Sequence, residues 1–142
     1  MQRHRCLVQL SRDHHVVLQI AEGLRKEGSA ALRAALPVTL AGRLEHLRGF
    51  AAAGLWPHFA VEEDHLFPAV RGRAAALDDL LARTLEEHAR IRALMAEVDS
   101  GRATEETLDA LGRLLIAHVR MEERDLFETI QRVVPPEVLD SL

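Results

Sequence analysis

HFAVEEDHLF at residues 58–67 is repeated later in the chain as HVRMEERDLF at residues 118–127, so both copies read His-x-x-x-Glu-Glu-x-x-Leu-Phe. The His and the first Glu of each copy are four residues apart, a spacing that places both side chains on one face of a helix. In each copy this face also carries the apolar residues of its segment. The pattern therefore predicts two helices that each direct a His and a Glu into the protein interior.

Glycines and prolines divide the chain into four segments with helical periodicity, and no segment alternates with the period of two that indicates a strand. We expect Ser11 and Thr104 to begin the first and fourth helices, and Pro57 to bend the second. A short turn is expected over residues 29–36. The four predicted helices cover residues 11–27, 38–72, 74–99 and 104–134.

Four amphipathic segments with short connections predict an all-α fold, an antiparallel up-down-up-down four-helix bundle. The first and third segments also share a weaker pattern, an acidic residue followed by His, in Asp13-His14 and Glu87-His88. The chain therefore resembles two copies of one helical hairpin related by a pseudo-twofold axis. With 142 residues, we expect a single domain over residues 1–142, with its core in residues 11–134.

The apolar faces of the four predicted helices contain enough His and Glu residues to hold metal ions. Four imidazoles and two carboxylates, without a thiolate, favour iron, with manganese as the alternative. A carboxylate can also bridge two metal ions, and an unpaired carboxylate in this position would be costly to bury. The candidate ligands are His14, His58, Glu62, His88, His118 and Glu122.

A single His on an apolar helix face is more often a hydrogen-bonded core residue than a ligand, but here every helix has one. On the first helix His14 continues the apolar stripe better than its neighbour His15, which leaves His15 as the alternative ligand. Ferritin-like di-metal proteins use a different motif, Glu-x-x-His, in which the carboxylate comes first and the spacing is three. The zinc-protease motif His-Glu-x-x-His is absent from the sequence.

The sequence blocks at residues 58–68, 87–92 and 118–127 resemble the hemerythrin-like, HHE cation-binding family, and the similarity extends over residues 11–134. The resemblance implies a four-helix bundle with an oxo- or hydroxo-bridged centre of two Fe ions, in which both carboxylates bridge the irons. Five ligands carry over from the family's motifs, namely His58, Glu62, His88, His118 and Glu122.

One position departs from the oxygen-carrying hemerythrins, which have a second His one turn before the first on the third helix. This chain has Thr84 there, which is a poor iron ligand. Each iron would then have two nitrogen ligands and an open position, unless Glu63, Glu87, Glu123 or His15 fills it. Two open positions favour chemistry with oxygen, peroxide or nitric oxide over reversible oxygen transport. We also weigh Glu63 and Glu123 as hydrogen-bond acceptors for ligand histidines, against a role as solvated surface charges.

Composition restricts the partners. The net charge is −4 and no basic stripe is present, so we expect no nucleic-acid partner. No apolar run approaches the roughly 18 residues of a membrane span, and Cys6 as the single cysteine favours the cytoplasm. A small diatomic molecule or peroxide is the expected ligand. The sequence leaves open whether the chain forms a homodimer. Enzymatic activity also stays open, because an iron-storage or iron-sensing module and a purely structural bundle are the alternatives.

Overall fold

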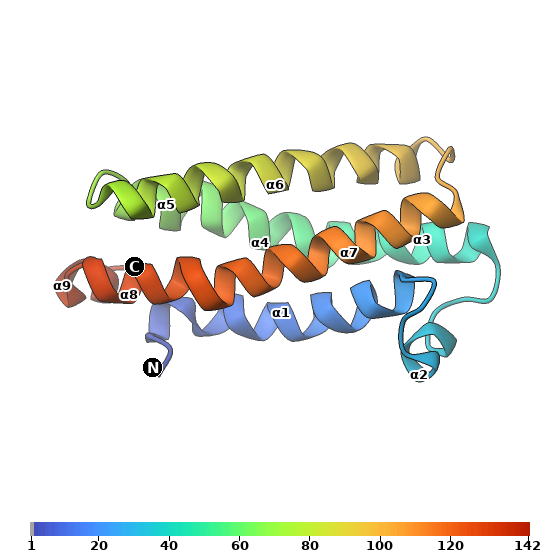
Figure 1. The fold of residues 1–142 in the computed structure, drawn as a ribbon, viewed down its shortest axis with the longest axis horizontal. Coiled ribbons are helices and arrows are strands. Elements are labelled where there is room, and N and C mark those ends of the chain that lie inside the picture. Colours follow the sequence, from blue (N-terminus) through green and yellow to red (C-terminus); the bar gives the residue numbers. More distant parts are fainter. Residues whose placement is uncertain (1) are drawn as a thin grey trace.

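The computed structural model describes residues 2–142, and this part of the chain contains helices and no strands, which confirms the all-α prediction. Most of the helices join end to end into long rods that lie side by side (Figure 1), and we number the rods in chain order. The first rod is α1 (Arg5–Leu24) and the third is α6 (Ala75–Asp99). The second rod consists of α3 (Leu40–Phe50), η1 (Ala51–Leu55), α4 (Trp56–Val61), η2 (Glu62–Leu66) and α5 (Phe67–Val70). The fourth consists of α7 (Glu105–Met121), η3 (Glu122–Leu126) and α8 (Phe127–Val133).

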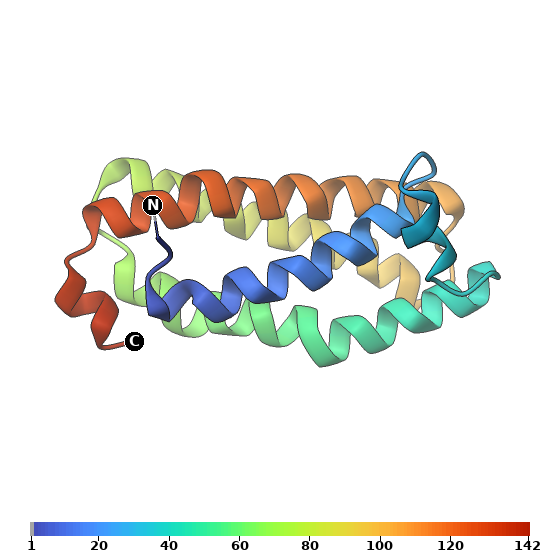
Figure 2. The ribbon, with the colours of Figure 1, turned by 90° about the horizontal axis from the view of Figure 1, so that it is seen from below.

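Two short helices lie outside the rods. The α2 helix (Ala30–Ala34) lies in the connection after α1, where the sequence predicted a short turn. The α9 helix (Pro136–Asp140) follows the fourth rod and was not predicted. Figure 2 shows that α9 lies at the same end of the molecule as the start of α1. Among the described residues, no helix is long and apolar enough to cross a membrane.

The first helix begins earlier than predicted. Ser11 does not begin α1, which starts at Arg5 with the His4 side chain accepting a hydrogen bond from the backbone N–H of Cys6. The extra turns bury Leu7 fully, in the same apolar cluster as Leu139 of α9. Thr104 begins α7 as predicted, and its hydroxyl accepts a hydrogen bond from the Thr107 N–H.

Pro57 does not end the second rod. It lies in the first turn of α4, directly after the π turn η1, in which the Trp56 N–H donates to the Ala51 carbonyl. A π turn inserts one extra residue into the helix, and it accommodates a proline that lacks a backbone donor. Pro68 follows η2 in the same way. The fourth rod has η3 at the position that corresponds to η2, without a proline.

The interior has two apolar clusters, one toward each end of the rods. One cluster contains Val17, Phe59, Ile91 and Val119, and the other contains residues such as Leu10. On every rod, the predicted metal-binding side chains lie where residues of one cluster meet those of the other. The rods therefore carry a polar layer across the middle of an otherwise apolar core.

Candidate metal centre

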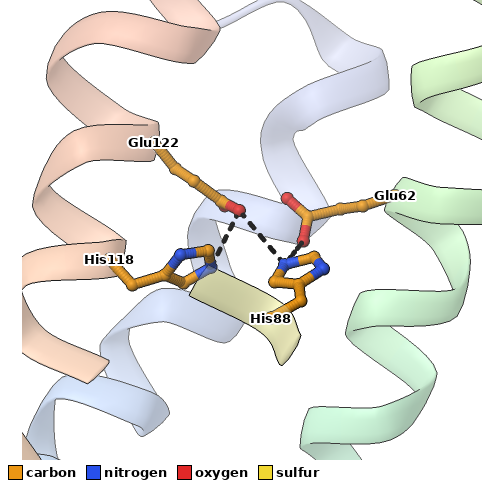
Figure 3. Close-up of side chains that lie close together, drawn as sticks. All are labelled: Glu62, His88, His118 and Glu122. Atoms are coloured by element: carbon orange, nitrogen blue, oxygen red, sulfur yellow. Dashed lines mark ion pairs between the residues drawn. The ribbon is translucent and has the colours of Figure 1, made fainter. Parts of the chain in front are cut away.

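The fold brings all six candidate ligands into the polar layer. Each is at most 3% exposed, and both carboxylates are 0% exposed. Figure 3 shows four of these side chains, which come from the second, third and fourth rods and point toward one another. The fold completes the set with one histidine from α1 and a second from α4. The six buried residues are His14, His58, Glu62, His88, His118 and Glu122.

Each buried carboxylate faces imidazole Nε2 atoms. Glu122 Oε2 lies 2.9 Å from Nε2 of His14, and Glu122 Oε1 lies 3.0 Å from Nε2 of His118. Glu62 Oε1 lies 3.3 Å from Nε2 of His88 and 3.4 Å from Nε2 of His58. All four rings thus present the same nitrogen to the middle of the cluster.

The opposite nitrogen of every ring, Nδ1, contacts a second carboxylate at the edge of the cluster. We call these four residues the outer carboxylates. The distances from Nδ1 are 2.7 Å for His14 to Glu123, 3.0 Å for His58 to Asp13, 2.6 Å for His88 to Glu63 and 2.9 Å for His118 to Glu87.

The outer contacts follow the internal repeat of the sequence. Within each helical hairpin, the acid that precedes the histidine of the first rod contacts the histidine of the second, as in Asp13 with His58 and Glu87 with His118. Between the hairpins, the second Glu of each Glu-Glu pair contacts the histidine on the other hairpin's first rod. The site therefore has the pseudo-twofold arrangement that the repeat predicted.

The outer carboxylates determine which ring nitrogen carries the proton. An ionised carboxylate only accepts hydrogen bonds, so each Nδ1 donates and each Nε2 of a neutral ring keeps a lone pair. Those lone pairs point toward Glu62 and Glu122, which are themselves acceptors. Buried atoms without a hydrogen-bond partner result: both oxygens of Glu62, Oε1 of Glu122, and Nε2 of His88 and His118. Such atoms are costly to bury unless a proton or a cation lies between them.

The donor atoms are close enough to share metal ions. Atoms of Glu62, His88, His118 and Glu122 all lie within 4.8 Å of one another, and so do atoms of His14, His58 and Glu122. The two groups share Glu122, which lies between them. Neutral imidazole with an outer carboxylate on Nδ1 is a usual arrangement for metal-binding histidine. The donor set therefore fits a metal centre.

Protonation of the metal-free cluster is uneven. Burial, together with the charge of Glu122, raises the pKa of Glu62 well above its ordinary value. Burial also acts to raise the pKa of Glu122, but the charge of His118 and hydrogen bonds from three histidines hold it well below the ordinary value. Burial lowers the pKa of His118, yet Glu122 and Glu87 outweigh it and raise that pKa to about 9. Without metal, Glu62 and His118 therefore hold a proton more tightly than they would in water, and Glu122 holds one less tightly.

Aromatic rings close two sides of the cluster. Phe59 stacks on His88 with the ring centroids 3.7 Å apart, and Phe127 stacks on His14 at 5.7 Å. Phe59 and Phe127 are at most 1% exposed. These rings hold the imidazoles in place and keep water from the buried carboxylates.

The alternatives left open by the sequence have clear positions in the structure. His14 is buried and His15 is exposed. Thr84 is buried, and its hydroxyl donates to the Leu80 carbonyl at 2.8 Å. Neither Glu63 nor Glu123 occupies the middle of the cluster, because both accept from imidazole Nδ1.

Sequence reasoning did not identify Asp13 and Glu87 as partners of histidines. Glu87 was weighed only as a residue that could fill an open metal position. The signal was present in the acid-before-histidine pattern of the first and third rods. This pattern could not be interpreted without knowing which helices lie next to each other at the level of the histidines.

The chain matches the sequence profile of one family, the hemerythrin HHE cation binding domain, over residues 7–130. No curated protein and no solved structure matches it. The matched range contains all six candidate ligands and the four outer carboxylates.

Proposed function

This chain belongs to the hemerythrin HHE cation-binding family, and on that premise we propose that it is a non-haem protein with two iron ions. In this proposal it binds or reduces oxygen, peroxide or nitric oxide, in sensing or in oxidative and nitrosative defence. Its four rods form an antiparallel up-down-up-down bundle and a single domain. The protein resides in the cytoplasm. Manganese is the alternative metal.

One observation supports the metal centre most strongly: imidazole nitrogens and buried carboxylate oxygens converge in the interior, and several of these atoms have no hydrogen-bond partner among residues 2–142. We assign Nε2 of four histidines and the carboxylates of Glu62 and Glu122 as the ligands. Two overlapping donor groups support two ions rather than one. The mixture of nitrogen and oxygen donors is typical of iron and manganese.

When bound, iron would supply one-electron redox chemistry and open positions for a small ligand. The protein contributes orientation and exclusion of water. The outer carboxylates hold each ring with Nε2 inward, and Phe59 and Phe127 shield the cluster. Thr84 adds no donor, because its hydroxyl is bonded to its own helix. Six donors for two ions leave positions free, which supports reactive or sensing chemistry rather than oxygen transport.

A second candidate is an iron-sensing or iron-storage module without catalysis. The unpaired buried atoms favour it, since they make the metal-free fold less stable than the metal-bound one. In such a module iron would raise the thermal midpoint strongly, while azide and peroxide would leave the spectrum unchanged.

The experiment is metal analysis of the purified chain, followed by absorption spectroscopy. Our proposal expects two irons per chain and the charge-transfer bands of a bridged pair, which shift when azide or peroxide is added. Stoichiometric iron with an azide-inert spectrum would favour the storage or sensing module. Absence of both iron and manganese after growth with added metal would contradict both candidates.

A further inference from the structure

The four outer carboxylates differ in whether a cationic side chain contacts them. Three of them also contact an arginine, whereas Asp13 contacts no Arg or Lys side chain in residues 2–142. Its remaining oxygen accepts from the neutral Gln9 amide at 2.9 Å. The arginine contacts are Arg3 to Glu123 at 2.7 Å, Arg92 to Glu63 at 2.9 Å and Arg83 to Glu87 at 3.4 Å.

The internal repeat provides a direct comparison for Gln9. Asp13 of the first hairpin corresponds to Glu87 of the second, and the residue four positions before each is Gln9 and Arg83 respectively. An Arg at that spacing forms an ion pair along the helix, and a Gln forms only a neutral hydrogen bond. The two hairpins thus differ in one charge at equivalent positions.

Asp13 is also the most open of the outer carboxylates. Its side chain is 33% exposed, against 10% for Glu87. It lines a pocket of about 220 Å³ between α1 and η1. The other walls are apolar and include the small residues Ala53 and Gly54, one turn before His58 on the second rod. The pocket leaves space beside the contact between Asp13 and His58.

The backbone around His58 differs from that around its counterpart. His58 lies on α4, a helix of 6 residues with η1 before it and η2 after it. His118 lies on the regular helix α7, and only η3 follows it. A π turn interrupts the regular hydrogen-bond pattern and is often found at functional sites.

We propose that His58 is the releasable ligand of the metal centre, and that metal ions enter and leave through the corner formed by α1 and η1. Three independent features meet there: the weakly held outer carboxylate, the pocket beside it, and the π turn before α4. The uncompensated charge of Asp13 also attracts cations to this corner. The inference rests on the proposed function, because it assigns a role within the proposed centre.

The test measures how fast the iron-loaded protein loses iron to an excess of a strong chelator. Gln9→Arg restores the arginine that the other hairpin has, and it should slow iron release about two- to fivefold. The matched control is Gln19→Arg, which adds the same charge on an exposed position of α1 and should release iron at the wild-type rate.

A second pair of variants tests the pocket. Ala53→Leu fills the pocket between α1 and η1 and should also slow release. Ala110→Leu fills a comparable pocket between α6 and α7, lined by Arg90 and Leu94 among others, and should have no effect. Both alanines are exposed, so the fold should be retained. An unchanged thermal midpoint of each metal-free variant checks this.

Equal release rates for Gln9→Arg and Gln19→Arg would overturn the inference, and so would equal slowing by Ala53→Leu and Ala110→Leu. Neither result would affect the proposed function, since the loaded protein would still contain its iron. A wild-type protein that takes up no metal would instead refute the proposed function itself.

Discussion

His14 lies between two carboxylates, with Nδ1 2.7 Å from Glu123 and Nε2 2.9 Å from Glu122. The two glutamates are neighbours in the sequence, but they have different roles. Glu122 is fully buried and faces the middle of the cluster. Glu123 accepts from the outer nitrogen of the ring and is itself held by Arg3. The three other histidines also lie between an inner and an outer carboxylate, and His118 shares the inner carboxylate Glu122 with His14.

The outer carboxylates should set metal affinity without binding metal. In Glu123→Gln, His14 loses an ionised acceptor, so the ring is oriented less firmly and is a weaker ligand. We expect metal affinity to fall about 10- to 100-fold, as measured by competition with a chelator of known affinity. Glu106→Gln is the control, because Glu106 is exposed and pairs with Lys26. Equal affinities of the two variants would show that Glu123 does not support His14.

Stability of the metal-free protein should fall in mildly alkaline solution. The pKa of His118 is raised from 6.5 to about 9 in the folded state. Its contribution to stability is therefore complete below pH 6.5 and is lost as the pH rises through 9. The thermal midpoint of the metal-free wild type should decrease over this range. His118→Gln should reduce the decrease, and His46→Gln, at an exposed position, should leave it unchanged.

Metal binding should have the opposite pH dependence. A metal ion binds the neutral imidazole and must displace the proton of His118, so apparent metal affinity should rise between pH 6.5 and 9. Titrations at several pH values in weakly buffered solution would measure both the affinity and the protons released. Affinity that is constant over this range would mean that no protonated His118 is displaced.

The close approach of α1 and α7 should be sensitive to one glycine. A Cβ atom on Gly112 would lie 2.5 Å from the Ala21 carbonyl oxygen and 3.2 Å from Leu24 Cβ. Gly112→Ala should therefore push the helices apart and lower the free energy of unfolding by about 1–3 kcal/mol. Gly49→Ala, where a Cβ meets nothing within 4 Å, should raise it by about 0.5–1 kcal/mol. Urea unfolding of both metal-free variants checks the contrast, and equal effects would contradict it.

Much of the fold and the polar layer could be predicted because helical periodicity is a local property. A His and a Glu four residues apart lie on one face of any helix, so their presence in the interior followed from the apolar residues around them. The choice of His14 over His15 depended on the same argument, and the structure buries His14.

Features that depend on contacts between distant segments could not be predicted. The first helix starts at Arg5, so that Leu7 joins an apolar cluster that includes Leu139 of α9, and the sequence near Ser11 contains no sign of that packing. To predict the pairing of Asp13 with His58, one must know how the first and second rods are positioned along their axes, and only the assembled bundle defines this.

Glu62 provides the most direct test of the central claim, that the buried cluster is a metal site. Its two oxygens have no hydrogen-bond partner within residues 2–142, and its side chain is 0% exposed. Glu62→Leu should raise the free energy of unfolding of the metal-free protein by about 1–3 kcal/mol, because a buried carboxyl group without hydrogen-bond partners is replaced by an apolar side chain.

The decisive measurement is the iron content of wild type and Glu62→Leu, purified in parallel from iron-supplemented medium. We predict two irons per chain in the wild type and loss of iron from the variant, although the variant is the more stable of the two without metal. Full retention of iron by the folded Glu62→Leu variant would contradict the account.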